Sequence, residues 1–288
     1  MRTAEKLTSR IAYHGEGPFW DSRSNRLLCM DALAGAVIAL DANGAIRRHS
    51  VPSRVVTVVR RRTRGGFVLA TERGLLVADD ALEKFEPFTT VVHDTAVRTN
   101  DGGCDPYGGF VIGTMSYAET PDAGAVYRVT ADRVVTKILA PVTISNGVQW
   151  SGDGRRAYYI DTPTRRVDTF NVEPHSGAWS GRAQHVRLGD EADGFPDGMA
   201  IDDEDGVWIA LWGGGAVHHY DAEGQLVERI WVPGVSQVSS CAFGGINRDV
   251  LYVTTSRQGL ADNDEPDAGA IFAVQTSVQG ALGWDFPG

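Results

Sequence analysis

Four short polar stretches of the chain place an oxygen-bearing side chain beside a glycine, each just before an apolar run. They contain Glu16, Asn100, Asn146 and Asp197, and Arg98 lies two residues before Asn100. Carboxylate and amide oxygens are the ligands that hard divalent cations such as Ca²⁺, Mg²⁺ and Mn²⁺ prefer. No Cys or His joins the set, which disfavours a thiolate zinc site. If the fold brings Glu16, Asn146 and Asp197 together, with Asn100 close by, they predict a site for one cation.

The elements that must position these residues follow a repeat. Six segments share one pattern, an apolar run, a short turn that usually contains glycine and a second apolar run. The first runs are residues 27–31, 67–71, 110–114, 157–161, 207–211 and 251–255. Their spacing of roughly 40 to 50 residues is the period of a four-stranded propeller blade. Because one blade cannot bury its own faces, the repeat predicts an all-β, six-bladed β-propeller.

We expect residues 1–288 to form this propeller as a single domain. A β-sandwich, or two small β domains, is the alternative architecture that the same pattern allows. In a propeller the innermost strands line a central channel, and equivalent positions of successive blades point toward its axis. The oxygen-bearing residues would then form a metal site in the central channel. The competing interpretation is that each Asn-Gly or Asp-Gly pair is an ordinary turn.

Composition narrows the function classes. The chain has 27 Lys and Arg against 37 Asp and Glu, a net charge of −10, so we expect no nucleic-acid partner. No apolar run approaches the roughly 20 residues that cross a bilayer, so we expect no membrane association. The three cysteines are far apart and form no disulfide framework, which favours a cytoplasmic protein. We interpret Arg60, Arg61, Arg62 and Arg64 as a solvated loop.

Seven stretches, in order along the chain, carry a resemblance to a known family. They are GEGPFWD (15–21), RTNDG (98–102), GTM (113–115), ISNG (144–147), PDGM (196–199), WGGG (212–215) and SSCAFGG (239–245). With them the sequence resembles the SMP-30/gluconolactonase/regucalcin family over nearly its whole length. The resemblance implies a six-bladed propeller that hydrolyses sugar lactones.

The resemblance also implies roles for individual residues. One divalent cation, with Ca²⁺ favoured and Zn²⁺, Mn²⁺, Mg²⁺ or Fe²⁺ possible, would be held by Glu16, Asn146 and Asp197. Asn100 and Arg98 would bind the substrate, and Asp197 would also be the general base. An acidic residue that contacts the sugar in many members follows Gly-Thr-Met, and Glu119 is a loose match to it.

The chemistry of lactone hydrolysis leaves alternatives open. Opening a cyclic ester needs an activated water and stabilisation of charge on the carbonyl oxygen, which a divalent cation supplies. Either Asp197 takes the proton from the attacking water, or water activated by the cation attacks while Asp197 only positions it. His14, beside Glu16, either shuttles protons or plays a supporting role. The rival functions are hydrolysis of other esters or organophosphates and non-enzymatic calcium binding. We expect a monomer or small homo-oligomer.

Overall fold

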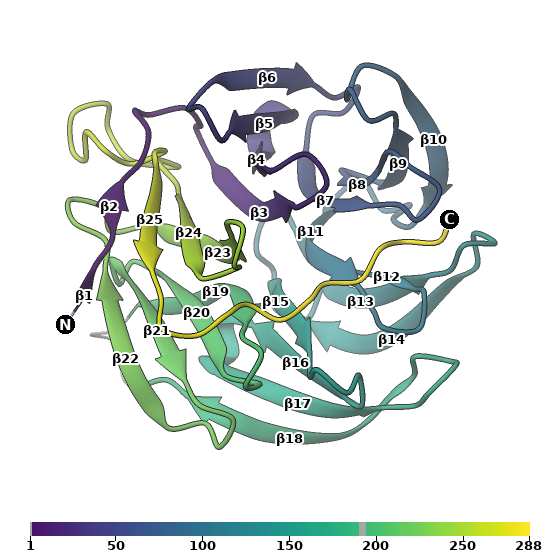
Figure 1. The fold of residues 1–288 in the computed structure, drawn as a ribbon. Coiled ribbons are helices and arrows are strands. Elements are labelled where there is room, and N and C mark those ends of the chain that lie inside the picture. Colours follow the sequence, from purple (N-terminus) through teal and green to yellow (C-terminus); the bar gives the residue numbers. More distant parts are fainter. Residues whose placement is uncertain (1, 190–193) are drawn as a thin grey trace.

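The computed structural model describes residues 2–189 and 194–288, whose strands form six sheets around a central axis (Figure 1). The innermost strands, in chain order, are β3 (Gly15–Asp21), β7 (Val56–Arg61), β11 (Val97–Cys104), β15 (Ser145–Trp150), β19 (Phe195–Ile201) and β23 (Val238–Gly244). Each packs against the inner strands of both neighbouring blades, so the six close a ring. The predicted all-β six-bladed propeller is confirmed.

The middle strands of the blades are the six pairs of apolar runs that the sequence repeat contains. They are β4 (Arg26–Asp31) and β5 (Ala36–Asp41), β8 (Phe67–Thr71) and β9 (Gly74–Ala78), β12 (Phe110–Ser116) and β13 (Gly124–Val129), β16 (Arg156–Asp161) and β17 (Arg166–Val172), β20 (Val207–Trp212) and β21 (Ala216–Tyr220), and β24 (Val250–Thr255) and β25 (Ile271–Gln275). The second strands of the first three blades, β4, β8 and β12, are buried along their whole length, and those of the other three blades are mostly buried. They read as continuous apolar runs because each face packs against another blade.

The outermost strands close the blades and face solvent. They are β6 (Ile46–Ser50), β10 (Phe85–Thr90), β14 (Val135–Val142), β18 (Trp179–Arg187), β22 (Leu226–Trp231) and, for the sixth blade, β2 (Glu5–Lys6). β2 pairs antiparallel with β25, while β1 (Arg2–Thr3) adds to β22 in parallel. The N-terminal segment thus ties the fifth blade to the sixth. Two 3-10 helices, η1 (Ala32–Ala34) and η2 (Thr162–Thr164), link middle strands.

Every inner strand carries a register irregularity near its start, and four of these contain the candidate residues. The shifts lie between Glu16 and Phe19, Thr99 and Gly102, Ser145 and Val148, and Pro196 and Met199. A β-bulge re-aims side chains and marks functional rims of barrels and sheets. The Asn-Gly and Asp-Gly pairs are therefore bulges inside strands, and the interpretation of these pairs as turns is wrong.

The glycines of two bulges are explained by close packing between blades. A Cβ added to Gly147 would lie 2.6 Å from the Cβ of Met199, and one added to Gly198 would lie 2.1 Å from Ser240 Oγ. Both distances are too short for any side chain. The glycines therefore let neighbouring inner strands approach at the level where the oxygen-bearing residues sit.

The interpretation of the arginine cluster as a solvated loop is wrong for Arg60 and Arg61, while Arg64 lies in an exposed turn. Arg60 and Arg61 end strand β7, and Arg61 is 4% exposed. Its guanidinium binds the buried Asp21 carboxylate through Nε at 2.8 Å and through a terminal nitrogen at 2.6 Å, and it also pairs with Asp80. Four arginines in sequence suggested solvation because Asp21, 40 residues away, was not recognised as the partner.

The C-terminal segment crosses one mouth of the channel (Figure 1, yellow). The Ala281 N–H donates to Ile201 O in the fifth blade, and the Phe286 N–H donates to Arg61 O in the second. The Phe286 ring is fully buried, with its edge against Phe88 and Phe110. The tail is thus anchored on both sides of the axis. No helix in the described ranges is long and apolar enough to cross a bilayer.

Candidate functional site

The bulges of two inner strands, β11 and β15, bring Arg98, Asn100 and Asn146 into direct contact. An Arg98 terminal nitrogen donates to Asn100 Oδ1 at 2.7 Å and to Thr99 O at 2.9 Å. Asn100 Nδ2 donates to Asn146 Oδ1 at 2.9 Å and to Ser145 O at 3.0 Å. Both amide hydrogens of Asn100 are therefore used within the protein, and only its Oδ1 has a lone pair left for a ligand.

The two candidate carboxylates, Glu16 and Asp197, lie close enough to act on each other's charge. Burial, followed by the negative charge of Asp101, raises the pKa of Glu16 to about 8, against opposing effects of the Gly17 N–H and Arg98. Burial and the charges of Glu16 and Asp101 raise the pKa of Asp197 well above its ordinary value. In the absence of a cation, burial and like charge thus disfavour the charged form of both groups.

This donor set fits a hard divalent cation. Asp197 and Asn146 are each 6% exposed, and the Glu16 side chain is 16% exposed. The two carboxylates repel each other, and a positive charge bound between them would stabilise both. Arg98 supplies such a charge only in part. Among the described residues no group of three or more His, Cys, Asp and Glu side chains is arranged to hold a metal. The fit therefore depends on the Asn146 oxygen as the third ligand.

His14 lies beside this cluster in its neutral form. Burial, then the charge of Arg98, lowers its pKa to about 3, although Asp31 opposes the shift. Its Nδ1 lies 2.8 Å from Ser256 Oγ, and its Nε2 lies 3.9 Å from a Glu16 oxygen. The ring also contacts Trp212 edge-on at 5.8 Å between centroids. His14 is thus held in place by packing and borders the Glu16 carboxylate.

Arg98 is flanked by residues that follow Gly-Thr-Met. The Tyr117 ring lies 5.9 Å from the Arg98 guanidinium carbon, and the Tyr117 hydroxyl donates to Glu72 at 2.5 Å. Burial lowers the pKa of Arg98, and the negative charge of Glu119 is among those that oppose the shift. Glu119, an exposed residue with φ of 53°, is therefore within electrostatic reach of Arg98, but no ion pair joins these two described residues.

Comparison with known proteins identifies the family. The sequence profile of the SMP-30/gluconolactonase/LRE-like region matches residues 14–257. The chain belongs to the SMP-30/gluconolactonase family. It is 33% identical over 273 residues to "Putative sugar lactone lactonase YvrE" of Bacillus subtilis (strain 168), covering 92% of each chain. It is 33% identical over 286 residues to regucalcin of Homo sapiens, covering 95% of each chain.

Solved structures of similar proteins share this fold. A calcium-binding regucalcin from Agrobacterium tumefaciens matches with a TM-score of 0.90 and 29% identity, over 99% of this chain and 97% of that one. A gluconolactonase from Xanthomonas campestris matches with a TM-score of 0.75 at 18% identity, over 94% of this chain and 88% of that one, which shows the fold alone.

Three residues of this family member were missed by sequence reasoning. Asp101 acts on the pKa values of both candidate carboxylates, and Arg60 in turn acts on Asp101. Thr162, in η2, accepts a hydrogen bond from Asn146 Nδ2 at 2.7 Å. The signal for Asp101 was its place next to Asn100, whereas Arg60 and Thr162 have no local signal because their partners lie in other strands.

The channel continues beneath the site as a cavity of about 490 Å³ lined by all six inner strands and the C-terminal tail. Arg60, Asp101 and Cys104 face it. All three cysteines are buried, and burial raises the pKa of each thiol, so none is a reactive thiolate.

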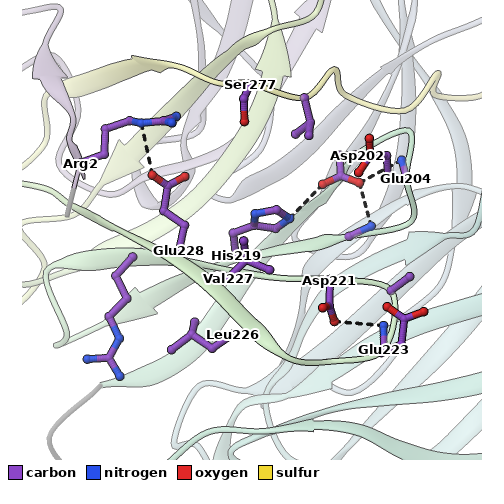
Figure 2. A pocket seen from close by; sticks show the side chains of 14 residues that line it. Arg2, Asp202, Glu204, His219, Asp221, Glu223, Leu226, Val227, Glu228 and Ser277 are labelled. Carbon is purple, nitrogen blue, oxygen red and sulfur yellow. Dashed lines mark hydrogen bonds and ion pairs between the residues drawn. The ribbon is translucent and has the colours of Figure 1, made fainter.

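A larger groove, of about 960 Å³, lies on the fifth blade and contains no predicted site residue among its described lining (Figure 2). His219 Nε2 lies 3.1 Å from an Asp202 oxygen, and Arg2 Nε lies 3.2 Å from a Glu228 oxygen. These charges are satisfied within the protein, and the described lining of the 490 Å³ cavity likewise contains none of the predicted site residues.

Proposed function

We propose that this protein hydrolyses sugar lactones to aldonic acids at a channel site that holds one divalent cation. Glu16, Asn146 and Asp197 would be the ligands. The observation that supports this most directly is the cluster of buried oxygen donors at the bulges of the inner strands, with Glu16 and Asp197 acting on each other's charge. Membership of the family and similarity to a protein named as a sugar lactone lactonase point to the same reaction.

The cation, when bound, would act as a Lewis acid toward the ester and its attacking water. We favour Ca²⁺, and the oxygen donors also accept Mg²⁺ or Mn²⁺. Zn²⁺ and Fe²⁺ are the further candidates to be compared.

Arg98 and Asn100 would bind and orient the sugar. Arg98 can only donate, so it pairs with a hydroxyl or carbonyl oxygen of the substrate. Asn100 has only its Oδ1 free, so it accepts from a substrate hydroxyl. A polyhydroxylated lactone offers both partners, whereas a simple alkyl ester has no hydroxyl for Asn100. Glu119 would contact the sugar from the loop beyond Tyr117.

Asp197 would take the proton from the attacking water. Its burial and the neighbouring negative charges raise its pKa in the cation-free protein, and a bound cation would oppose this rise, so the role of Asp197 as base rests on its place beside the attacking water. Because Asp197 is 6% exposed, few bulk waters compete for it.

The test compares Asp197→Asn with Asp203→Asn, an exposed aspartate shortly after the same strand. Chelated protein is re-metallated with one ion at a time, and hydrolysis of aldonolactones is followed by acid release with a pH indicator. We expect Asp197→Asn to lose about 10²–10⁴-fold in kcat or more, since it removes a base and the negative charge of a ligand, and Asp203→Asn to match wild type. Normal turnover and metal content in Asp197→Asn would show the site is misassigned.

A second candidate function is calcium binding without catalysis. It is favoured by the similarity to regucalcin and to a solved structure described as a calcium-binding protein. The same assay separates the two functions. Cation binding with no turnover of any lactone with any ion supports the second function, whereas cation-dependent turnover supports the first.

A further inference from the structure

The amide side chains of Asn100 and Asn146 lie in the middle of a hydrogen-bond chain with a fixed direction. The chain begins at Arg98, whose guanidinium can only donate. It donates to Asn100 Oδ1 at 2.7 Å, and Asn100 Nδ2 donates in turn to Asn146 Oδ1 at 2.9 Å. The direction at this end is set because Arg98 has no acceptor to offer.

The other end of the chain is Thr162, the first residue of η2. Asn146 Nδ2 donates to Thr162 Oγ1 at 2.7 Å, and Thr162 Oγ1 donates to the Pro196 carbonyl at 2.8 Å. A carbonyl oxygen can only accept, so the hydroxyl proton goes to Pro196 and the hydroxyl lone pair receives Asn146. Pro196 immediately precedes Asp197.

Neither amide group can rotate by 180° without breaking this series of hydrogen bonds. Rotating the Asn146 amide would aim its NH₂ group at the Asn100 NH₂ group and its oxygen at a hydroxyl already committed as a donor to Pro196. Because both ends have fixed polarity, the amide orientations follow from the chemistry of the donors and acceptors. The chain also connects the third, fourth and fifth blades.

We propose that Thr162 is a positioning residue for the cation site. Its hydroxyl fixes the Asn146 amide so that oxygen, and not nitrogen, is presented on the Asn100 side, and it couples Asn146 to the strand that carries Asp197. The inference rests on the proposed function in treating Asn146 as a ligand. Partners that hold a ligand in orientation are worth about 10–100-fold in metal affinity.

The protein offers a matched control residue, Thr164, in the same 3-10 helix. Thr164 is also half-buried, and its hydroxyl donates to Asp161 O at 2.6 Å, within its own turn. Thr164→Val therefore removes the same group and one hydrogen bond without touching the Asn146 amide. Thr162→Val removes the hydroxyl of the chain at nearly constant shape, and Thr162→Ser restores it.

The first measurement is cation affinity, by titration calorimetry of chelator-stripped protein with Ca²⁺ and with Mn²⁺. We expect Thr162→Val to bind about 10–100-fold more weakly than wild type, with Thr162→Ser and Thr164→Val unchanged. Thermal unfolding in chelator checks that each variant folds, and Thr162→Ala replaces Thr162→Val if the latter does not. Wild-type affinity in the folded variant that lacks the Thr162 hydroxyl overturns the proposal.

The second measurement needs no cation. In the stripped protein, the side-chain NH₂ signals of Asn100 and Asn146 are assigned with Asn100→Asp and Asn146→Asp and followed by ¹⁵N NMR. Thr162→Val should shift both pairs of signals, and Thr164→Val should shift neither. If wild type binds no cation, the proposed function fails, but this measurement still tests whether the hydrogen bonds from Arg98 to Thr162 exist. Unmoved Asn signals in Thr162→Val would refute the chain itself.

Discussion

Replacing Glu16 by glutamine is expected to stabilise the cation-free protein at pH 7 and above while it removes the negative charge of a proposed ligand. Burial and the charge of Asp101 raise the pKa of Glu16 from 4.5 to about 8, and the Gly17 N–H and Arg98 offset this only in part. Near neutral pH the folded protein must therefore hold a proton that the unfolded chain has released. Glutamine is neutral and of nearly the same shape, so it avoids this requirement.

The sign and size follow from the two pKa values. Because the folded pKa lies above the unfolded value, the stability from Glu16 is complete below pH 4.5 and lost as pH rises through about 8. Between these two pH values the free energy of unfolding falls by up to about 1.4 kcal/mol per pH unit. His14, whose pKa burial lowers from 6.5 to about 3, has the opposite slope, confined to pH below 6.5. From pH 6.5 to 8, Glu16 thus accounts for a loss of about 2 kcal/mol.

The assay is urea unfolding in chelator at pH 6.5 and pH 8. Wild type should lose at least about 2 kcal/mol between the two, because Asp197, whose pKa is also raised, can only add to the loss. Glu16→Gln should lose clearly less, since the charge of Glu16 also raises the pKa of Asp197. Glu86→Gln, at an exposed position of β10, is the control and should keep the wild-type slope. A flat wild-type profile, or equal slopes in wild type and Glu16→Gln, would refute the reasoning.

Two further changes separate binding from stability. Tyr117→Phe keeps the ring near Arg98 but removes the hydroxyl bonded to Glu72, so steady-state kinetics should show KM rising about two- to tenfold with kcat little changed. An equal fall in kcat would contradict this. Asp105→Asn leaves the buried Arg128 guanidinium, 2.5 Å from Asp105, without its counter-charge, and should cost about 3–5 kcal/mol in urea unfolding while kcat of the folded protein is kept. A loss below about 1 kcal/mol would count against a paired buried charge.

The blades could be predicted from the sequence because their information is local. Each middle strand is a short apolar run, and the turns between paired runs contain residues such as Gly35, Gly213 and Gly269 at positive φ. The inner strands were harder to recognise. Their bulges interrupt the alternation of polar and apolar side chains, which is also why the oxygen-bearing residues stood out.

The partnerships of the site could not be predicted, since they depend on how blades are set against each other. Asn146 and Thr162 are 16 residues apart, and Asn100 and Asn146 are 46 apart. No spacing rule joins positions in different blades when the register shifts within each inner strand. Arg60 was misread for the same reason, because its neighbour Asp101 lies on the next blade.

The bulges explain why the candidate site and the closure of the ring occur together. A bulge brings Glu16, Asn146 or Asp197 to the axis only if the next blade packs tightly against it, which Gly147 and Gly198 permit. Closure then buries two carboxylates that repel each other, a cost borne by the packing between blades. A cation that binds only the folded protein returns stability as RT ln(1 + [cation]/Kd), about 2.7 kcal/mol at a hundredfold excess over Kd. If the cation binds as proposed, the same residues weaken the empty ring and strengthen the loaded one.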